Sequence, residues 1–238
     1  MNIENKINDV PGKVDFDNYA GRYEKVLDKQ LDFFGEENSY FADYKVKLVK
    51  DTLTSDPENI LEFGCGIGRN LKFFTKYFPD ADIYGSDISD KSLEIAKNEN
   101  PSVKFFMLED EEIKSYKGKF DLIFISCVLH HIAPDLRKSS MDTVYSMLNN
   151  NGSAYIFEHN PYNPVTRHIV NTCEWDTDAV LLNMKESVNL FENAGLKVTE
   201  KNYTLFYPAA LKFLRFTENF LKKIPMGGQY YVKAVKKK

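Results

Sequence analysis

The sequence predicts an α/β protein whose mostly parallel sheet is doubly wound, with helices on both faces. Apolar strand patterns alternate with amphipathic helix patterns between residues 59 and 159, which is typical of this fold class. The segment 120–129 is a nearly unbroken apolar run, as expected for a central parallel strand buried on both sides. With 238 residues, of which 43% are hydrophobic, the chain is long enough to form one complete core.

Each element follows from its local pattern and from the residues that bound it. The first helix of the alternating region ends before Pro79, and the second begins at Ser89 or Asp90, either of which can cap its N-terminus. The Asn151-Gly152 pair predicts a turn before the fifth strand. The strands are expected at 59–63, 82–87, 102–108, 120–129 and 153–159, and the helices at 69–78, 89–100, 136–150 and 185–196.

The C-terminal part completes a predicted seven-stranded sheet. Residues 197–207 and 227–236 alternate like paired strands, which indicates an antiparallel hairpin at the edge of the sheet. Between them, residues at about 208–224 predict an inserted amphipathic helix. The Phe and Leu stripe of this helix, at 211–221, is expected in the core or in a dimer face rather than on a membrane. We place the whole of 56–238 in one domain.

The first 55 residues predict a helical cap. Apolar and aromatic residues recur there at three- and four-residue steps over 14–53. A second cover is expected at 160–182, where prolines and mixed polarity predict a long loop with some helix. We expect the N-terminal cap 1–55 to act as a lid over a ligand site.

Composition restricts the partners. The net charge of −4 argues against a nucleic-acid partner, which calls for a basic surface. Three cysteines predict a cytoplasmic chain without a disulfide framework. The N-terminus lacks a signal-peptide pattern, and no apolar run approaches the roughly 18 residues that a bilayer span needs. We therefore expect a monomer or homodimer in the cytoplasm, with no membrane partner.

The glycine-rich stretch "LEFGCGIGRN" at 61–70 predicts a turn against which a ligand lies. A dinucleotide fingerprint would place its third glycine at 69, where the chain has Arg69, and a phosphate-binding Gly-Lys-Ser/Thr is missing from the sequence. Glu62, just before the turn, suits a ligand with an ammonium group. Asp87 ends the second strand, where a carboxylate can accept hydrogen bonds from two ribose hydroxyls.

These motifs resemble those of the class I S-adenosylmethionine-dependent methyltransferases. "LEFGCGIGRN" is similar to the first motif of that family, "GSDIS" to its ribose-binding motif and "FDLIFISCVLHHI" to its fourth-strand motif. The resemblance implies a Rossmann-like fold, S-adenosylmethionine as cofactor and S-adenosylhomocysteine as product. It implies that the cofactor-binding residues are Tyr19, Glu62, Gly64, Cys65, Gly66, Asp87, Ile88, Glu109, Asp110, Ser126 and Leu129.

The family also implies a role for individual residues. The backbone of Gly64 to Gly66 would lie against the methionine and ribose, with Ile88 on the adenine. Either Glu109 or Asp110 would hold the adenine amino group, while Ser126 and Leu129 would line the methionine side. The stretch "FDNYAGRY" resembles an N-terminal helix of small-molecule methyltransferases, in which a tyrosine, here Tyr19 or secondly Tyr23, reaches the cofactor carboxylate.

The acceptor is expected to be a small molecule. The fourth strand ends in Ser126-Cys127 rather than in acids, so we predict no metal ion. The Asn/Asp-Pro-Pro-Tyr/Phe signature of nucleic-acid amino-methylating enzymes does not occur after that strand. "FEHNPYNPVTRHIV" resembles bacterial methyltransferases of saccharide and secondary-metabolite assembly, which implies a hydroxyl acceptor of that kind.

A histidine suits deprotonation of such a hydroxyl. We predict that His159, at the end of the fifth strand, is the general base, with His131 as the second candidate. Glu158 or Asn160 would orient the ring or the substrate. Two other functions stay open at this point. One is a non-catalytic cofactor-binding module, and the other is a nicotinamide-dependent oxidoreductase acting on a nucleotide sugar.

Overall fold

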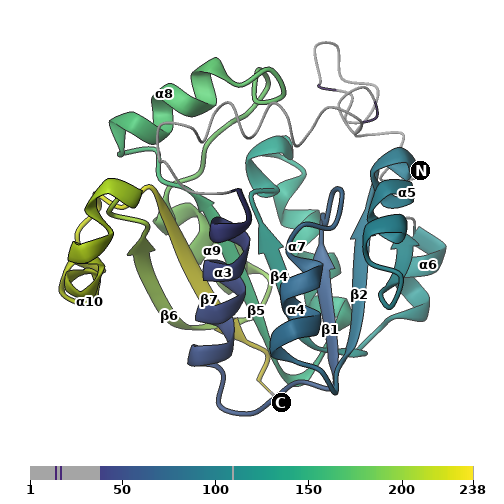
Figure 1. Ribbon diagram of the computed structural model, residues 1–238. Coiled ribbons are helices and arrows are strands. Elements are labelled where there is room, and N and C mark those ends of the chain that lie inside the picture. Colours follow the sequence, from purple (N-terminus) through teal and green to yellow (C-terminus); the bar gives the residue numbers. More distant parts are fainter. Residues whose placement is uncertain (1–13, 15–16, 18–37, 109, 238) are drawn as a thin grey trace.

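The computed structural model describes residues 14, 17, 38–108 and 110–237. It contains one seven-stranded sheet in the order β3-β2-β1-β4-β5-β7-β6 (Figure 1). The first five strands pair in parallel, and β7 pairs antiparallel with both β5 and β6. The predicted fold class and its antiparallel edge are thereby confirmed. The strands are β1 Asn59–Phe63, β2 Asp82–Asp87, β3 Lys104–Met107, β4 Phe120–Ser126, β5 Leu148–His159, β6 Lys197–Thr204 and β7 Gln229–Val235.

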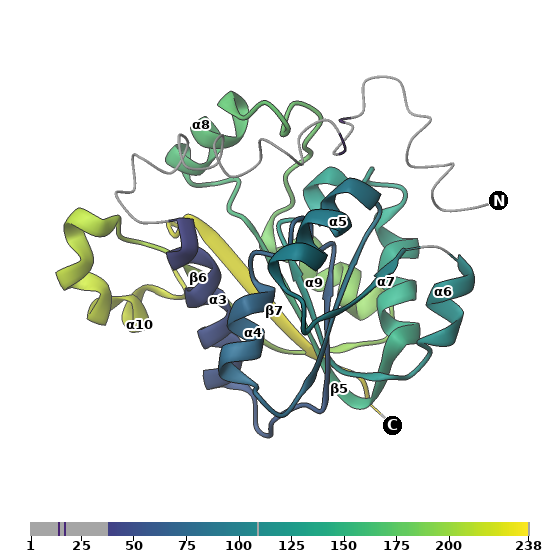
Figure 2. The same cartoon turned by 45° about the vertical axis from the view of Figure 1, so that its right-hand side comes forward.

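Helices cover both faces of the sheet (Figures 1 and 2). One core cluster contains side chains of α7 and α9, and the other contains side chains of α3, α4 and α5. The helices are α3 Asn38–Thr52, α4 Leu71–Tyr77, α5 Asp90–Glu99, α6 Asp110–Ser115, α7 Arg137–Met147, α8 Pro164–Thr172, α9 Met184–Asn193 and α10 Glu218–Leu221, with the 3-10 helices η4 Leu129–His131 and η5 Ala209–Thr217.

Strand β4 lies at the centre of the sheet and is buried on both sides, as its apolar run predicts. Ile123 and Ile125 belong to one core cluster, and Leu122 and Phe124 belong to the other. The strand is shorter than predicted, because Cys127 has a positive φ of 57° and turns the chain into η4. The turn places the residues after β4 above the carboxyl ends of the parallel strands.

The predicted boundary between α7 and β5 was wrong by a few residues, and one short helix was missed. Helix α7 ends at Met147 rather than at 150, because Leu148 already pairs with Phe120 of β4. Helix α6 was not predicted at all. It is a six-residue helix in a polar stretch whose periodicity is too short to detect.

The described part of the N-terminal cap packs on the core, whereas the insertion exposes its apolar side chains. Val46 and Val49 of α3 are fully buried in the cluster that also contains Ile60, so at least this part of 1–55 packs directly on the sheet. The insertion at about 208–224 lies between β6 and β7, as η5 and α10. Its phenylalanines are exposed, so the expectation of a core position for this stripe was wrong. No helix in the described part of the chain is long and apolar enough to cross a membrane.

Candidate functional site

The glycine turn after β1 forms the floor of the candidate site. Gly64, Gly66 and Gly68 all have positive φ, at 72°, 52° and 82°. A side chain at Gly64 would collide with Val128, and one at Gly68 would meet Asn100. These two glycines therefore allow close packing within the protein. A Cβ atom added at Gly66, in contrast, would meet no described atom within 4 Å. The backbone of Gly66 is therefore open to a ligand.

Asp87 joins the end of β2 to the glycine turn. Its Oδ2 accepts a hydrogen bond of 2.7 Å from the Gly66 N–H, and its Oδ1 accepts one of 3.0 Å from the Ser89 N–H. Burial raises the pKa of Asp87, although these backbone donors oppose the shift. A carboxylate has about four acceptor positions, so Asp87 retains capacity for further donors such as hydroxyl groups.

Glu62 is a buried acid at the end of β1, and only 1% of its surface is exposed. Its Oε1 accepts a hydrogen bond of 2.5 Å from Asn70, whereas its buried Oε2 has no hydrogen-bond partner among the described residues. Burial raises the pKa of Glu62 to about 8, despite the opposing effects of Asn70 and Lys45. An orphaned buried carboxylate oxygen is costly and is satisfied by a cationic donor such as an ammonium group.

Cys127 and His159 lie at the neighbouring ends of β4 and β5. The Cys127 Sγ is 3.7 Å from the Lys45 Nζ and 3.4 Å from the Gln229 Nε2. Burial raises the pKa of the Cys127 thiol, but Lys45 and a hydrogen bond with His159 outweigh it and lower the pKa to about 6. Lys45 also donates a hydrogen bond of 2.8 Å to Ser126 Oγ. Lys45 therefore places a buried ammonium group beside Ser126 and Cys127, at the end of β4.

Comparisons with known proteins agree with this geometry. A family model described as "Methyltransferase domain" matches residues 61–154, which include the glycine turn, Asp87 and β4. Residues 61–154 are therefore a methyltransferase domain, and the sheet has the Rossmann-like fold of class I S-adenosylmethionine-dependent methyltransferases. A crystal structure of an S-adenosylmethionine-dependent methyltransferase from Archaeoglobus fulgidus superposes with a TM-score of 0.68 at 15% identity, and the match covers 90% of this chain and 100% of that one.

The curated relatives match only parts of their own length. The chain is 31% identical over 146 residues to malonyl-[acyl-carrier protein] O-methyltransferase 1 of Ilyobacter polytropus, and the match covers 59% of this chain and 46% of that protein. It is 33% identical over 104 residues to an uncharacterized protein of Rickettsia prowazekii, 41% of each chain. The matched part therefore spans less than half the length of both relatives.

S-adenosylmethionine is the cofactor of this family, and the residues of the methyltransferase domain fit it. The orphaned Glu62 Oε2 suits its ammonium group, and the open face of Gly66 leaves room beside Asp87 for a ribose. Ile88 is half-buried just after β2, and Leu129 is fully buried at the start of η4. Among the remaining predicted cofactor residues, Ser126 accepts a hydrogen bond from Lys45, and the N–H of the buried Cys65 donates one to the Ser86 carbonyl oxygen. Asp110 is the first residue of α6. Tyr19 and Glu109 lie outside the described residues.

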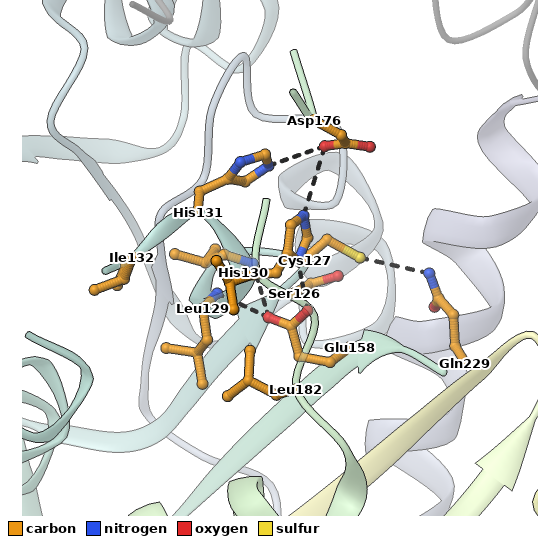
Figure 3. A network of polar contacts seen from close by, with 12 residues as sticks. Ser126, Cys127, Leu129, His130, His131, Ile132, Glu158, Asp176, Leu182 and Gln229 are labelled. Atoms are coloured by element: carbon orange, nitrogen blue, oxygen red, sulfur yellow. Dashed lines mark hydrogen bonds and ion pairs between the residues drawn. The ribbon is translucent and has the colours of Figure 1, made fainter. Parts of the chain in front are cut away.

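A second polar network fixes the loop that follows β4 (Figure 3). The Glu158 Oε2 is 2.6 Å from the His130 Nδ1, and the Glu158 Oε1 accepts from the N–H groups of Val128 and Leu129. Asp176 approaches the other ring nitrogen of His130 at 3.7 Å. Burial lowers the pKa of His130, but the two carboxylates outweigh burial and raise it. His130 therefore carries its proton at neutral pH.

His131 has a different environment. Its Nε2 is 3.3 Å from Asp176 Oδ1, and its Nδ1 is 3.8 Å from Asp178 Oδ1. Burial and the neighbouring His130 lower the pKa of His131, although the two aspartates oppose this. One donor atom each from His130, His131 and Asp176 lie within 4.8 Å of one another, so these three could hold a metal ion. The absence of a metal stays a prediction.

Several site residues were missed by sequence reasoning. Lys45 contacts Ser126, which lies 81 residues further along the chain, and Asp176 contacts His130, which lies 46 residues before it. A local sequence pattern cannot predict contacts between residues so far apart. The prediction that Glu158 or Asn160 orients the His159 ring or the substrate stays a prediction. Glu158 bonds to His130, and the Asn160 side chain donates to the carbonyl oxygens of residues 225 and 227.

Proposed function

We propose that this protein transfers the methyl group of S-adenosylmethionine to a hydroxyl group of a small acceptor, such as a saccharide or a secondary metabolite. The observation that carries the proposal is that the predicted cofactor residues and the predicted general base lie at the same edge of the sheet. Glu62, Gly66 and Asp87 lie at the ends of β1 and β2, and His159 lies at the end of β5 beyond β4. When bound, the cofactor supplies an electrophilic methyl group on a good leaving group. The chain must then position the acceptor and remove its proton.

His159 is the proposed general base. Its side chain is half-buried, and its ring centroid is 5.1 Å from that of His130. His130 is a poor base, because Glu158 and Asp176 keep it protonated. A hydrogen bond with Cys127 also orients the His159 ring. His131 stays the second candidate, since its lowered pKa makes it neutral near pH 7.

Cofactor binding and acceptor turnover are tested separately. Isothermal titration calorimetry should detect binding of S-adenosylhomocysteine and of S-adenosylmethionine, and it should detect no binding of NAD. Binding of NAD alone would support the oxidoreductase alternative and refute the proposal. Turnover is then sought with methyl-labelled cofactor against pools of sugar nucleotides and of other small hydroxyl compounds. Cofactor binding without turnover in any pool would favour the non-catalytic module, and label recovered on an amine would refute the hydroxyl assignment.

A further inference from the structure

The insertion between β6 and β7 exposes an unusual amount of apolar surface. Nine large apolar side chains in the described part of the chain are strongly exposed, and six of them lie between residues 211 and 226. Phe216 is 71% exposed, Phe220 83% and Met226 69%. Scattered exposed apolar residues are normal, whereas a contiguous group indicates an interaction site. We call this group the insertion face; it consists of Leu211, Phe213, Phe216, Phe220, Ile224 and Met226, together with Tyr162.

The insertion exposes its apolar side chains and turns two of its charged side chains inward. The Arg215 guanidinium lies 4.3 Å from the centroid of the Tyr40 ring, and Glu218 accepts a hydrogen bond of 3.3 Å from the Phe206 N–H. Phe213 and Phe216 in η5 and Phe220 in α10 follow one another at steps of three and four residues, and all three side chains are exposed, as is Ile224 just after α10. A surface helix normally buries its apolar stripe, so this one is arranged for a partner outside the chain.

Neighbouring segments hold the insertion face in place beside the candidate site. The Asn160 side chain donates to the carbonyl oxygens of Pro225 and Gly227, and the Asn163 side chain donates to that of Met226. These bonds bring Tyr162 next to the end of the insertion. Figures 1 and 2 show η5 and α10 projecting beyond β6 at the edge of the sheet, below α8.

The charged side chains around the insertion face favour a lipid surface over a second copy of the chain as its partner. Lys212, Lys222 and Lys223 are exposed around the insertion face, and the acid of the insertion, Glu218, turns inward. A two-fold dimer through this face would set the same lysines against one another, which opposes self-association. Exposed phenylalanines flanked by lysines are typical of helices that lie in the interface of anionic membranes.

We propose that the insertion face docks the protein onto an anionic lipid bilayer. The phenylalanines enter the boundary between headgroups and acyl chains, and the three lysines meet the anionic headgroups. This inference is independent of the acceptor that the methyltransferase domain modifies. It contradicts our expectation from the sequence that the protein has no membrane partner, an expectation that rested on the absence of a spanning segment.

Vesicle sedimentation of the full chain tests the proposal. The wild-type protein should sediment with vesicles of phosphatidylcholine and phosphatidylglycerol, and less with phosphatidylcholine alone. The double variant Phe216→Ser/Phe220→Ser should bind at least about tenfold more weakly, because each lost ring removes transfer free energy. Val180→Ser is the matched control, since Val180 is an exposed apolar residue, 47% accessible, outside the insertion face. It should bind like the wild type, and Lys212→Gln/Lys222→Gln should lose the preference for phosphatidylglycerol.

Three results would overturn the proposal. The first is a wild-type protein that stays in the supernatant with both kinds of vesicle. The second is equal weakening by Val180→Ser and by the double phenylalanine variant. The third is a dimer in analytical ultracentrifugation that the phenylalanine variant abolishes, because a second copy would then cover the face. Circular dichroism of each variant checks that the fold is retained.

Discussion

The Gly66 amide donates a 2.7 Å hydrogen bond to the Asp87 carboxylate, and this bond connects the turn after β1 with the end of β2. The carboxylate is therefore already oriented by the protein, with remaining acceptor positions for a ligand. Asp87→Ala should weaken S-adenosylhomocysteine binding by about 1.5–3 kcal/mol, the range for hydrogen bonds to a charged group. Calorimetry measures this, with Asp82→Ala, at the exposed opposite end of β2, as the control. Unchanged affinity in a folded Asp87→Ala protein would refute the role.

Glu62 is expected to oppose folding and to favour cofactor binding. Its pKa rises from 4.5 to about 8 in the folded protein, so folding retains a proton that the unfolded chain releases between these values. Stability should therefore fall as the pH rises from about 4.5 to about 8, and Glu62→Gln should abolish that loss. At pH 8.5 this variant should melt at a higher temperature than the wild type yet bind the cofactor more weakly.

The matched control for this experiment is Glu58→Gln, because Glu58 is exposed just before β1. It should leave both the melting temperature and the affinity unchanged. A Glu62→Gln protein that binds the cofactor as tightly as the wild type would show that the orphaned oxygen does not contact the ammonium group.

Cys127 should react as a thiolate at mildly acidic pH. Lys45 and His159 lower its pKa to about 6, so the rate of alkylation by iodoacetamide should reach half of its plateau near that pH. Lys45→Met removes the cation at similar volume, and the half-maximum should move to higher pH. Mass spectrometry assigns the label, and the buried thiols of Cys65 and Cys173 are internal controls. A pH profile that Lys45→Met leaves in place would contradict the electrostatic explanation.

His159→Ala should lower kcat by roughly 10²–10⁴, the usual contribution of a general base. Cofactor affinity should be nearly unchanged, because the residue lies at the end of β5, beyond β4 from the glycine turn. His168→Ala, at an exposed position on α8, serves as the control. Normal turnover by the His159 variant would transfer the role to His131 or to positioning alone. A collapse of cofactor binding would place His159 in the cofactor pocket instead.

The sequence was most informative where local pattern and burial agree. β1 and β2 begin and end at the predicted residues, because each is a short apolar run between turn residues. β4 stops early for a reason that hydropathy cannot show, since the positive φ of Cys127 is a backbone property of a non-glycine residue. Lys45 and Asp176 enter the site through tertiary contacts alone. The exposed stripe of the insertion was misjudged because periodicity identifies an apolar face without saying whether a partner within the chain covers it.

The loop after α8 is held at three points by contacts within the protein. Asp176 meets His130, the Val180 N–H donates to the His130 oxygen at 2.8 Å, and the Arg137 side chain donates to the Val180 oxygen at 2.6 Å. Because the sequence predicts that the segment 160–182 covers the acceptor, we expect selectivity there to come from a loop that the protein already holds in place. An acceptor of complementary shape then binds without the entropy cost of ordering the loop. An acceptor of a different shape is excluded, because the loop does not change its conformation to accommodate it.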